Sequence, residues 1–204
     1  MDYLILGFLT GLSLILAIGA QNVFVIEQGL KKQYIFLVCL ICSISDLLLI
    51  FLGIFLFQYL NNYFTLTVEL IFNILLLIFL LYFIWGKIRI KASETSLNVD
   101  SKTNNLSSIL VKTLGFTFLN PHVYLDSVFF LGNFSKNFGL IDKYYFGIGV
   151  TISSFIFFFT IGYMSKYLSK HLQNKRVWKK INLFIIIFMS ILALYILIEI
   201  LSFN

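Results

Sequence analysis

The sequence is poor in charge, histidine, cysteine and proline. Charged residues make up 12% of its 204 residues, and there are two histidines, two cysteines and one proline. So little charge, beside 60% hydrophobic residues, excludes a soluble globular domain and predicts an integral membrane protein. The sequence also lacks a phosphate-binding loop, a G-x-S-x-G turn and any soluble stretch large enough to fold alone. Nucleotide-driven and hydrolase functions are therefore excluded.

The few cysteines and histidines leave two alternative functions open. Cys39 and Cys42 form a C-x-x-C within an apolar segment, where no basic flank favours the thiolate. Packing is their favoured role, and a membrane thiol–disulfide protein is the alternative. Metal-cation efflux is the other alternative, although His122 is the single histidine inside an apolar segment and His171 lies in a basic loop. We expect no bound metal and no cofactor.

Long apolar runs are what the sequence has in abundance. Six runs reach about 20 residues, the length that crosses the hydrocarbon core of a bilayer as a helix. They cover residues 4–26, 34–57, 65–85, 106–134, 144–163 and 181–203. We therefore predict an all-α integral membrane protein whose six transmembrane helices form a single domain over residues 1–204. Asp2 stands where a signal peptide would carry basic residues, so we expect the first helix to remain in the membrane.

Positive charge is concentrated in alternate connections between these runs. All of the 15 lysine and arginine residues except Lys136 and Lys143 lie in or beside the first, third and fifth connections. The positive-inside rule then predicts that these connections face the cytoplasm and that both termini face outward. We interpret this basic surface as a signal of topology and lipid attraction, with no role in binding nucleic acid.

The chain divides into two halves around a polar linker. Residues 87–107 are rich in Ser, Asn, Thr and Lys, as is typical of a flexible connection. Three helices precede this linker and three follow it. Because three is odd, the two halves, about 1–86 and about 108–204, enter the membrane in opposite senses and form inverted repeats.

Matching interruptions support this division. Gly19 is expected to break the first helix as Pro121 breaks the fourth. The next helix of each half offers a serine and a glycine at equal spacing, Ser45 with Gly53 and Ser154 with Gly162. Paired broken helices at corresponding positions indicate the binding site of a transporter.

Ionisable residues lie beside these interruptions. Proline removes an amide donor and clashes with the preceding turn, so the fourth helix must break near Asn120 and leave carbonyls that lipid cannot satisfy. Asp126 follows this break, and Asp46 lies on a face of small residues in the second helix. Carboxylates are costly inside a membrane and usually line a pathway or pair with a partner.

Several motifs carry a resemblance to a known family. They are Gly19-Ala20-Gln21-Asn22-Val23-Phe24-Val25, Gln28-Gly29-Leu30, Cys42-Ser43-Ile44-Ser45-Asp46 and Leu119-Asn120-Pro121-His122-Val123-Tyr124-Leu125-Asp126. In order and spacing they resemble the LysE superfamily of exporters, and within it the lysine and arginine exporter branch. The resemblance implies proton-driven export of basic amino acids across the bacterial cytoplasmic membrane. Ala20 is a departure, because the family usually has proline there.

A cationic amino acid also suits the residues themselves. Carboxylates bind its cationic groups through charge-assisted hydrogen bonds, and the freed amides of broken helices bind its carboxylate. Moving a positive charge out of a negative-inside cell costs about 2.3 kcal/mol per 100 mV, so export needs inward ions. A carboxylate for which proton and substrate compete provides that coupling. Sodium coupling and export of a neutral amino acid remain alternatives.

We therefore expect a substrate and proton site between the broken helices. Its predicted members are Asp46, Asp126, Gln21, Asn22, Ser45, Asn120, His122 and Tyr124. Gly7 and Gly11 form a G-x-x-x-G in the first helix, which indicates close helix packing either within the chain or in a homo-oligomer.

Overall fold

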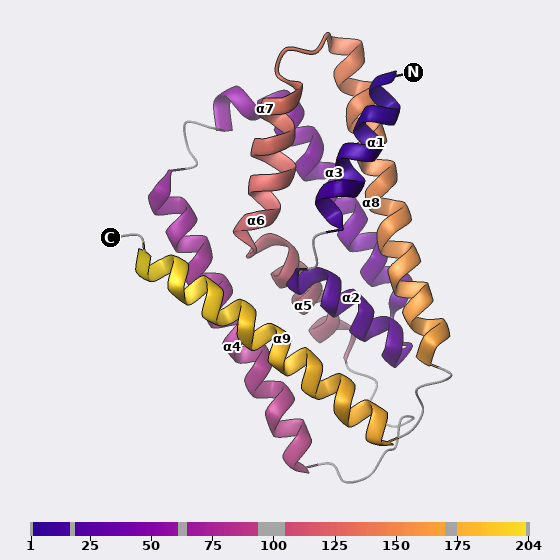
Figure 1. The fold of residues 1–204 in the computed structure, drawn as a ribbon, viewed down its shortest axis with the longest axis vertical. Coiled ribbons are helices and arrows are strands. Elements are labelled where there is room, and N and C mark those ends of the chain that lie inside the picture. Colours follow the sequence, from indigo (N-terminus) through magenta and orange to yellow (C-terminus); the bar gives the residue numbers. More distant parts are fainter. Residues whose placement is uncertain (1, 17–18, 61–64, 94–104, 170–174, 203–204) are drawn as a thin grey trace.

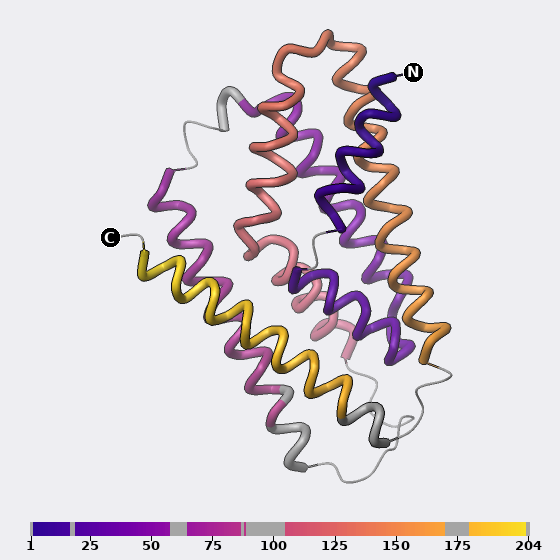
Figure 2. The backbone as a smooth tube through the Cα atoms, in the orientation of Figure 1, coloured from indigo at the N-terminus to yellow at the C-terminus, as the bar shows by residue number. Residues whose placement is uncertain are grey.

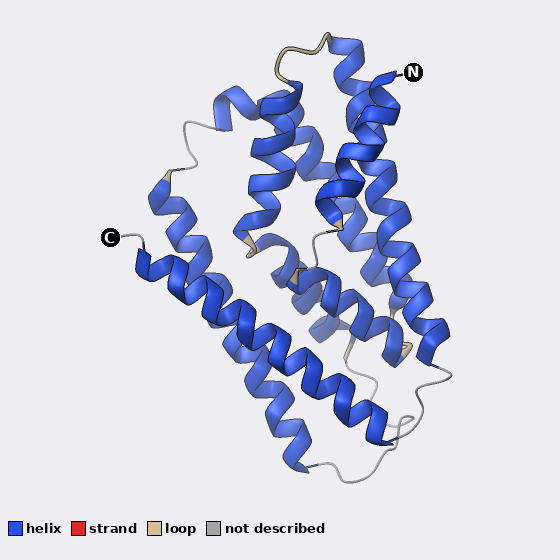
Figure 3. Ribbon diagram, viewed as in Figure 1, coloured by secondary structure: helices blue, strands red, loops and turns tan. Residues whose placement is uncertain are grey.

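A computed structural model describes residues 2–16, 19–60, 65–93, 105–169 and 175–202, and these residues form helices and connections but no strand (Figure 3). Figure 1 shows how the helices are arranged. In chain order they are α1 (Asp2–Ile15), α2 (Ala20–Lys31), α3 (Ile35–Leu60), α4 (Leu66–Ser93), α5 (Leu106–Phe118), α6 (Pro121–Tyr124), the π-helix η1 (Leu125–Phe130), α7 (Leu131–Ser135), α8 (Leu140–Ser169) and α9 (Lys175–Ser202). The all-α prediction is confirmed.

Four helices are long and apolar enough to cross a membrane, namely α3, α4, α8 and α9. The bent pair of α1 and α2 makes a fifth candidate span. These helices confirm a multi-pass membrane protein. The first predicted span, residues 4–26 with its break at Gly19, forms two helices bent by 83°. The fourth predicted span is likewise divided into α5, α6, η1 and α7.

Both helix breaks fall where the sequence predicts them. Gly19 precedes α2 with an extended backbone, φ −109° and ψ −176°, so the helical path stops before it. Asn120 is also extended, and Pro121 occupies the first position of α6, where its missing N–H costs nothing. The Asn120 side chain accepts a hydrogen bond from the His122 N–H at 3.1 Å and caps this helix start.

The two breaks are closed in the same way. Asn22 Nδ2 donates to the Ile15 carbonyl at 3.1 Å, and the Tyr124 hydroxyl donates to the Phe118 carbonyl at 2.9 Å. In each case a side chain from the second piece satisfies a carbonyl that the end of the first piece leaves free. Such compensation is what irregular backbone requires at membrane depth.

Helix α8 is the central packing element, since it contacts α1, α2 and α3. Its approach to α1 brings backbone against backbone: a Cβ at Gly7 would meet the Phe146 carbonyl, and a Cβ at Gly149 would meet the Leu4 carbonyl. The G-x-x-x-G of residues 7–11 therefore serves a contact within the chain.

Helices α4 and α9 form a separate antiparallel pair that crosses the remaining helices (Figure 2). Helix α4 continues to Ser93, into the region predicted as linker, because each further residue adds a helical hydrogen bond. Residues 94–104 of that linker lie outside the described residues.

The basic connections meet at one end of the molecule. The C-termini of α2 and α8 and the N-termini of α5 and α9 lie together at the lower end of Figure 1, which we call the basic end. The start of α1 and the connection from α7 to α8 lie at the opposite end. When every second connection of a membrane protein is basic, the basic connections must lie on one side of the membrane. The basic connections at one end and the α7–α8 connection at the other fit this requirement.

Candidate functional site

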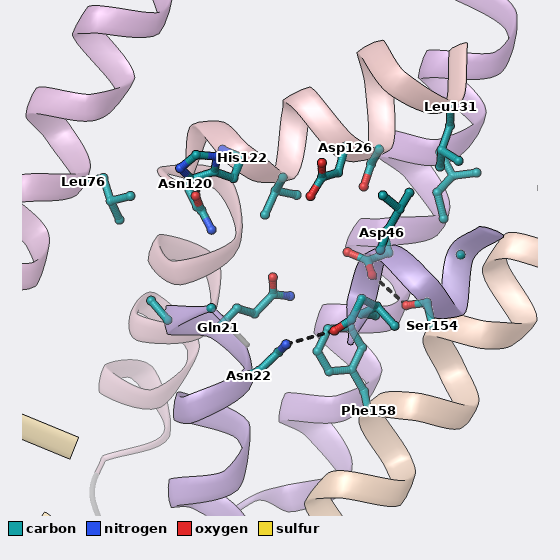
Figure 4. A pocket seen from close by; sticks show the side chains of 18 of the residues that line it. Gln21, Asn22, Asp46, Leu76, Asn120, His122, Asp126, Leu131, Ser154 and Phe158 are labelled. Atoms are coloured by element: carbon teal, nitrogen blue, oxygen red, sulfur yellow. Dashed lines mark hydrogen bonds between the residues drawn. The ribbon is translucent and has the colours of Figure 1, made fainter. Parts of the chain in front are cut away.

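A cavity of about 320 Å³ lies between the two broken helices. Its walls come from both pieces of the first break, from the second break, and from α3, α4, α8 and α9 (Figure 4). The polar residues that line it are Gln21, Asn22, Asp46, Asn120, His122, Asp126, Ser127, Ser153, Ser154 and Tyr195. The cavity therefore gathers polar groups that are far apart in the sequence.

Asp46 enters this cavity from α3. Its side chain is 8% exposed, and the Ser154 hydroxyl of α8 donates to its Oδ2 at 2.7 Å. Ser43 and Cys39, on the same face of α3, are fully buried. A carboxylate with one hydrogen-bond donor from the protein still has capacity to accept more hydrogen bonds from a ligand.

Asp126 enters from the other broken helix. It lies in the π-helix η1, five residues after Pro121, and points into the same cavity as Asp46 (Figure 4). His122 lies one turn earlier on the same helical stretch and interacts electrostatically with it. The wider π-turn changes which side chains face the cavity, and such turns are frequent at functional sites.

The charge of the lining is one-sided. It holds two carboxylates, while none of the described lining residues is lysine or arginine. Buried carboxylates are stabilised by a cation or a proton, and among the described lining residues no lysine or arginine acts as the cation. The cavity is therefore electrostatically suited to a cationic ligand.

The start of α2 offers partial positive charge to the cavity, in contrast to the two carboxylates. Gly19, Ala20, Gln21 and Asn22 line the cavity at the N-terminus of this 12-residue helix, and Gly19 makes no side-chain cap hydrogen bond. The first N–H groups of a helix lack intrahelical acceptors, and the helix dipole places partial positive charge there. An anionic group of a ligand finds hydrogen-bond donors at this end.

An apolar wall completes the cavity. Leu76 and Leu80 of α4, Leu192 and Ile196 of α9, and Phe158 of α8 contribute to it. Such side chains pack against the methylene groups of a ligand, while the polar groups fix its orientation.

The cavity brings together six of the eight predicted site residues. Ser45 and Tyr124 do not line it. Ser45 is buried elsewhere on α3, because it is one residue removed from the face that carries Asp46. Tyr124 is turned back toward Phe118, whose carbonyl its hydroxyl binds, and its ring contacts that of Phe72.

Other lining residues carry little signal in the sequence. Tyr195 is a single aromatic residue in the apolar helix α9, yet its ring centroid lies 6.2 Å from that of His122. Ser153 and Ser127 resemble the serines that pack membrane helices throughout such proteins. Ser154 belongs to the repeated serine–glycine spacing of the two halves, and its hydroxyl donates to Asp46 in the cavity.

The two cysteines pack behind the lining and are not part of it. Both thiols are free and fully buried, and the Cys39 thiol donates to the Phe158 carbonyl at 3.2 Å. This packing role is the one favoured by the sequence. Among the described residues, no group of three or more His, Cys, Asp or Glu side chains is placed to hold a metal ion.

Membrane-crossing helices around a polar cavity with one-sided charge define a membrane transport protein. The LysE type translocator family model matches residues 12–200, and the chain belongs to this family. It is accordingly a transporter and not an enzyme.

Curated relatives cover most of the chain. An arginine exporter protein, ArgO, of Pectobacterium atrosepticum is 34% identical over 181 residues, which is 88% of each chain. ArgO of Pectobacterium carotovorum is also 34% identical, over 92% of this chain and 93% of its own. ArgO of Salmonella paratyphi A is 30% identical over 94% of this chain and 92% of its own. No solved structure matches.

Proposed function

We propose that this protein exports basic amino acids, L-arginine and also L-lysine, from the bacterial cytoplasm across the inner membrane. The observation that carries the proposal is the pair of carboxylates, Asp46 and Asp126, in a cavity whose described lining has no lysine or arginine. The curated relatives that share most of the chain are named arginine exporters. Charge complementarity and this relationship favour the same substrate.

In the proposed binding mode, the cavity receives the substrate in one orientation. The cationic side chain pairs with Asp46 and Asp126, and its planar guanidinium is suited to bidentate contact with a carboxylate. The methylene stem packs on the apolar wall formed by Leu76 and its neighbours. The α-carboxylate lies at the start of α2, with Gln21 and Asn120 nearby as amide partners.

Protons drive export in this proposal. A substrate cation leaves against a negative-inside potential at a cost of about 2.3 kcal/mol per 100 mV, and inward protons supply that energy. Asp46 and Asp126 bind either the substrate cation or a proton, because both compete for the same oxygen atoms. His122, one turn from Asp126 and beside Tyr195, assists proton movement.

The finer architecture belongs to the same proposal, namely six membrane segments in two inverted three-helix repeats with residues 1–204 as one transport domain. Two matched glycine contacts support it. A Cβ at Gly29 would meet the Gly162 carbonyl, and a Cβ at Gly132 would meet the Gly53 carbonyl. Thus the second piece of each broken helix packs against a glycine of a long helix from the other half.

Efflux from preloaded cells tests the function directly. Cells expressing the protein are loaded with radiolabelled arginine, lysine, threonine or leucine, and efflux is followed with and without an uncoupler. We expect arginine and lysine to leave faster than from cells without the protein, and the uncoupler to abolish the difference. Faster efflux of leucine or threonine alone would instead assign a neutral amino acid, and efflux that depends on sodium would replace the proton.

A further inference from the structure

A third buried carboxylate lies outside the cavity. Glu27 is 2% exposed and belongs to the C-terminal half of α2, whereas the N-terminal residues of the same helix line the cavity. Every residue from Ala20 to Leu30 except Ile26 is buried. A carboxylate in such surroundings requires compensating charge, because burial of an unpaired ion is costly.

Two ammonium groups provide that charge. Lys31, one turn further along α2, places its Nζ 2.5 Å from Glu27 Oε1, and its side chain is 30% exposed at the basic end. Lys112 of α5 interacts electrostatically with both Glu27 and Lys31. Lys31 is thus in direct contact with Glu27, and Lys112 is a second cation close enough to act on both.

A free acceptor lies beside the cluster. Gln28 is 2% exposed, and its Oε1 has no hydrogen-bond partner. A buried acceptor without a donor loses free energy that a ligand N–H restores on binding. A carboxylate, an ammonium group and an amide oxygen thus come from the last turns of α2, and a second ammonium group comes from α5.

We propose that Glu27, Lys31 and Lys112 form a second substrate site, the Glu27 site, at which the cationic side chain of a basic amino acid displaces the Lys31 ammonium from Glu27 before it reaches the cavity. The α-carboxylate of the substrate pairs with Lys112 or with the released Lys31. This inference rests on the proposed export of basic amino acids, and it assigns their point of entry.

Substrate can replace Lys31 at Glu27 at low energetic cost because one cation is exchanged for another. The Glu27 carboxylate keeps a positive partner throughout, so no unpaired charge is left buried during entry. A guanidinium forms two parallel hydrogen bonds to a carboxylate, whereas an ammonium acts as a point charge. Arginine consequently displaces Lys31 more readily than lysine does, and the Glu27 site contributes to selectivity.

Helix α2 connects this site to the cavity. Glu27 is six residues from Gln21, a rise of about 9 Å along a helix. A Cβ at Gly29 would meet the Gly162 carbonyl, so α2 packs closely on α8 and behaves as one element. Substrate bound at Glu27 thus contacts the helix whose start borders Asp46 and Asp126.

Transport by inside-out membrane vesicles tests the Glu27 site, because their outer face exposes the basic end. Uptake of radiolabelled arginine and lysine gives KM and the maximal rate. We expect Glu27→Gln to raise the KM for arginine by about tenfold or more, as loss of a charge-assisted contact does. Lys31→Met removes the competing ammonium, so it lowers the KM for arginine and narrows the preference for arginine over lysine.

A matched control and a folding control accompany these variants. Lys32 is exposed and adjacent to Lys31, so Lys32→Met should keep the wild-type KM. The double variant Glu27→Gln, Lys31→Met removes both charges of the Glu27–Lys31 ion pair and leaves Lys112 as the remaining charge of the cluster, and we expect it to reach the membrane with the raised KM of Glu27→Gln.

Opposite shifts of KM distinguish a substrate site from a structural ion pair. A purely structural pair predicts that Glu27→Gln and Lys31→Met both lower protein level and maximal rate and leave KM unchanged. That result, with wild-type protein transporting arginine, would overturn the Glu27 site alone. Wild-type vesicles that transport neither arginine nor lysine would instead reject the proposed function.

Discussion

At the scale of single residues, the carboxylates of Asp46 and Asp126 are the groups on which function depends most. Asparagine keeps the side-chain size and removes the charge, so both substrate cation and proton lose their shared partner. We expect arginine efflux to fall by about tenfold to a hundredfold in Asp46→Asn and in Asp126→Asn, with normal amounts of protein in the membrane. Glutamate at either position should retain partial efflux with an altered pH dependence.

Two further variants serve as controls for the loss of the Asp46 and Asp126 charges. Ser154→Ala removes the donor to Asp46 Oδ2 and keeps the charge, so a smaller decrease is expected. Asp142→Asn removes a carboxylate of the first turn of α8, away from the cavity lining, and should export normally. Wild-type efflux in both Asp46→Asn and Asp126→Asn would move the coupling group to His122 or to Glu69, which lies in the first turn of α4.

At the scale of helices, the contact of α1 with α8 depends on glycine at the point of closest approach. A Cβ at Gly149 would meet the Leu4 carbonyl, which belongs to a backbone that cannot move without displacing α1. We expect Gly149→Ala to destabilise the protein by about 1–3 kcal/mol, as overpacking typically does. Thermal unfolding of purified protein in detergent should show a lower midpoint.

Gly86 provides the matched control for this variant. It lies in the helix α4, and no heavy atom stands within 4 Å of where its Cβ would be. Gly86→Ala should be neutral or stabilising by up to about 1 kcal/mol, because alanine favours the helix more than glycine does. Equal midpoints for Gly149→Ala and wild type would mean that the two helices do not meet at Gly149.

The positions of helix breaks can be predicted from the sequence, whereas the angles between helices cannot. The break at Asn120 and Pro121 is a local effect of proline, so it is predictable, and polar residues beside it gather because lipid excludes them. The angle between α1 and α2 is set by packing on α8, and no local pattern encodes it. As a result, Glu27 falls just beyond the predicted span of 4–26, although the structure buries it within the molecule.

The sequence also does not predict that α9 contributes Tyr195 to the cavity, because this contribution depends on helix packing. Tyr195 reaches the cavity only because the α4–α9 pair crosses the other helices, and its neighbours in the sequence are apolar. The π-helix at Leu125–Phe130 is equally unmarked, since no residue type in this segment distinguishes a π-turn from an α-turn. Tertiary packing therefore decides which of many similar residues face the site.

At the scale of the whole molecule, orientation in the membrane remains a prediction, with both termini outside. The end that carries the C-termini of α2 and α8 is basic, and the positive-inside rule assigns it to the cytoplasm. Exposed positions near each end provide labelling sites. Lys32 lies between α2 and α3 at the basic end, and Asn137 lies between α7 and α8 at the other.

Single cysteines at these positions test the orientation in a protein whose Cys39 and Cys42 are replaced by serine, which keeps a donor for the Phe158 carbonyl. We expect a membrane-impermeant thiol reagent to label Asn137→Cys in intact cells and Lys32→Cys only after permeabilisation. The reverse pattern would place the basic end outside. It would also make the Glu27 site face the periplasm, where it would release substrate and could not admit it.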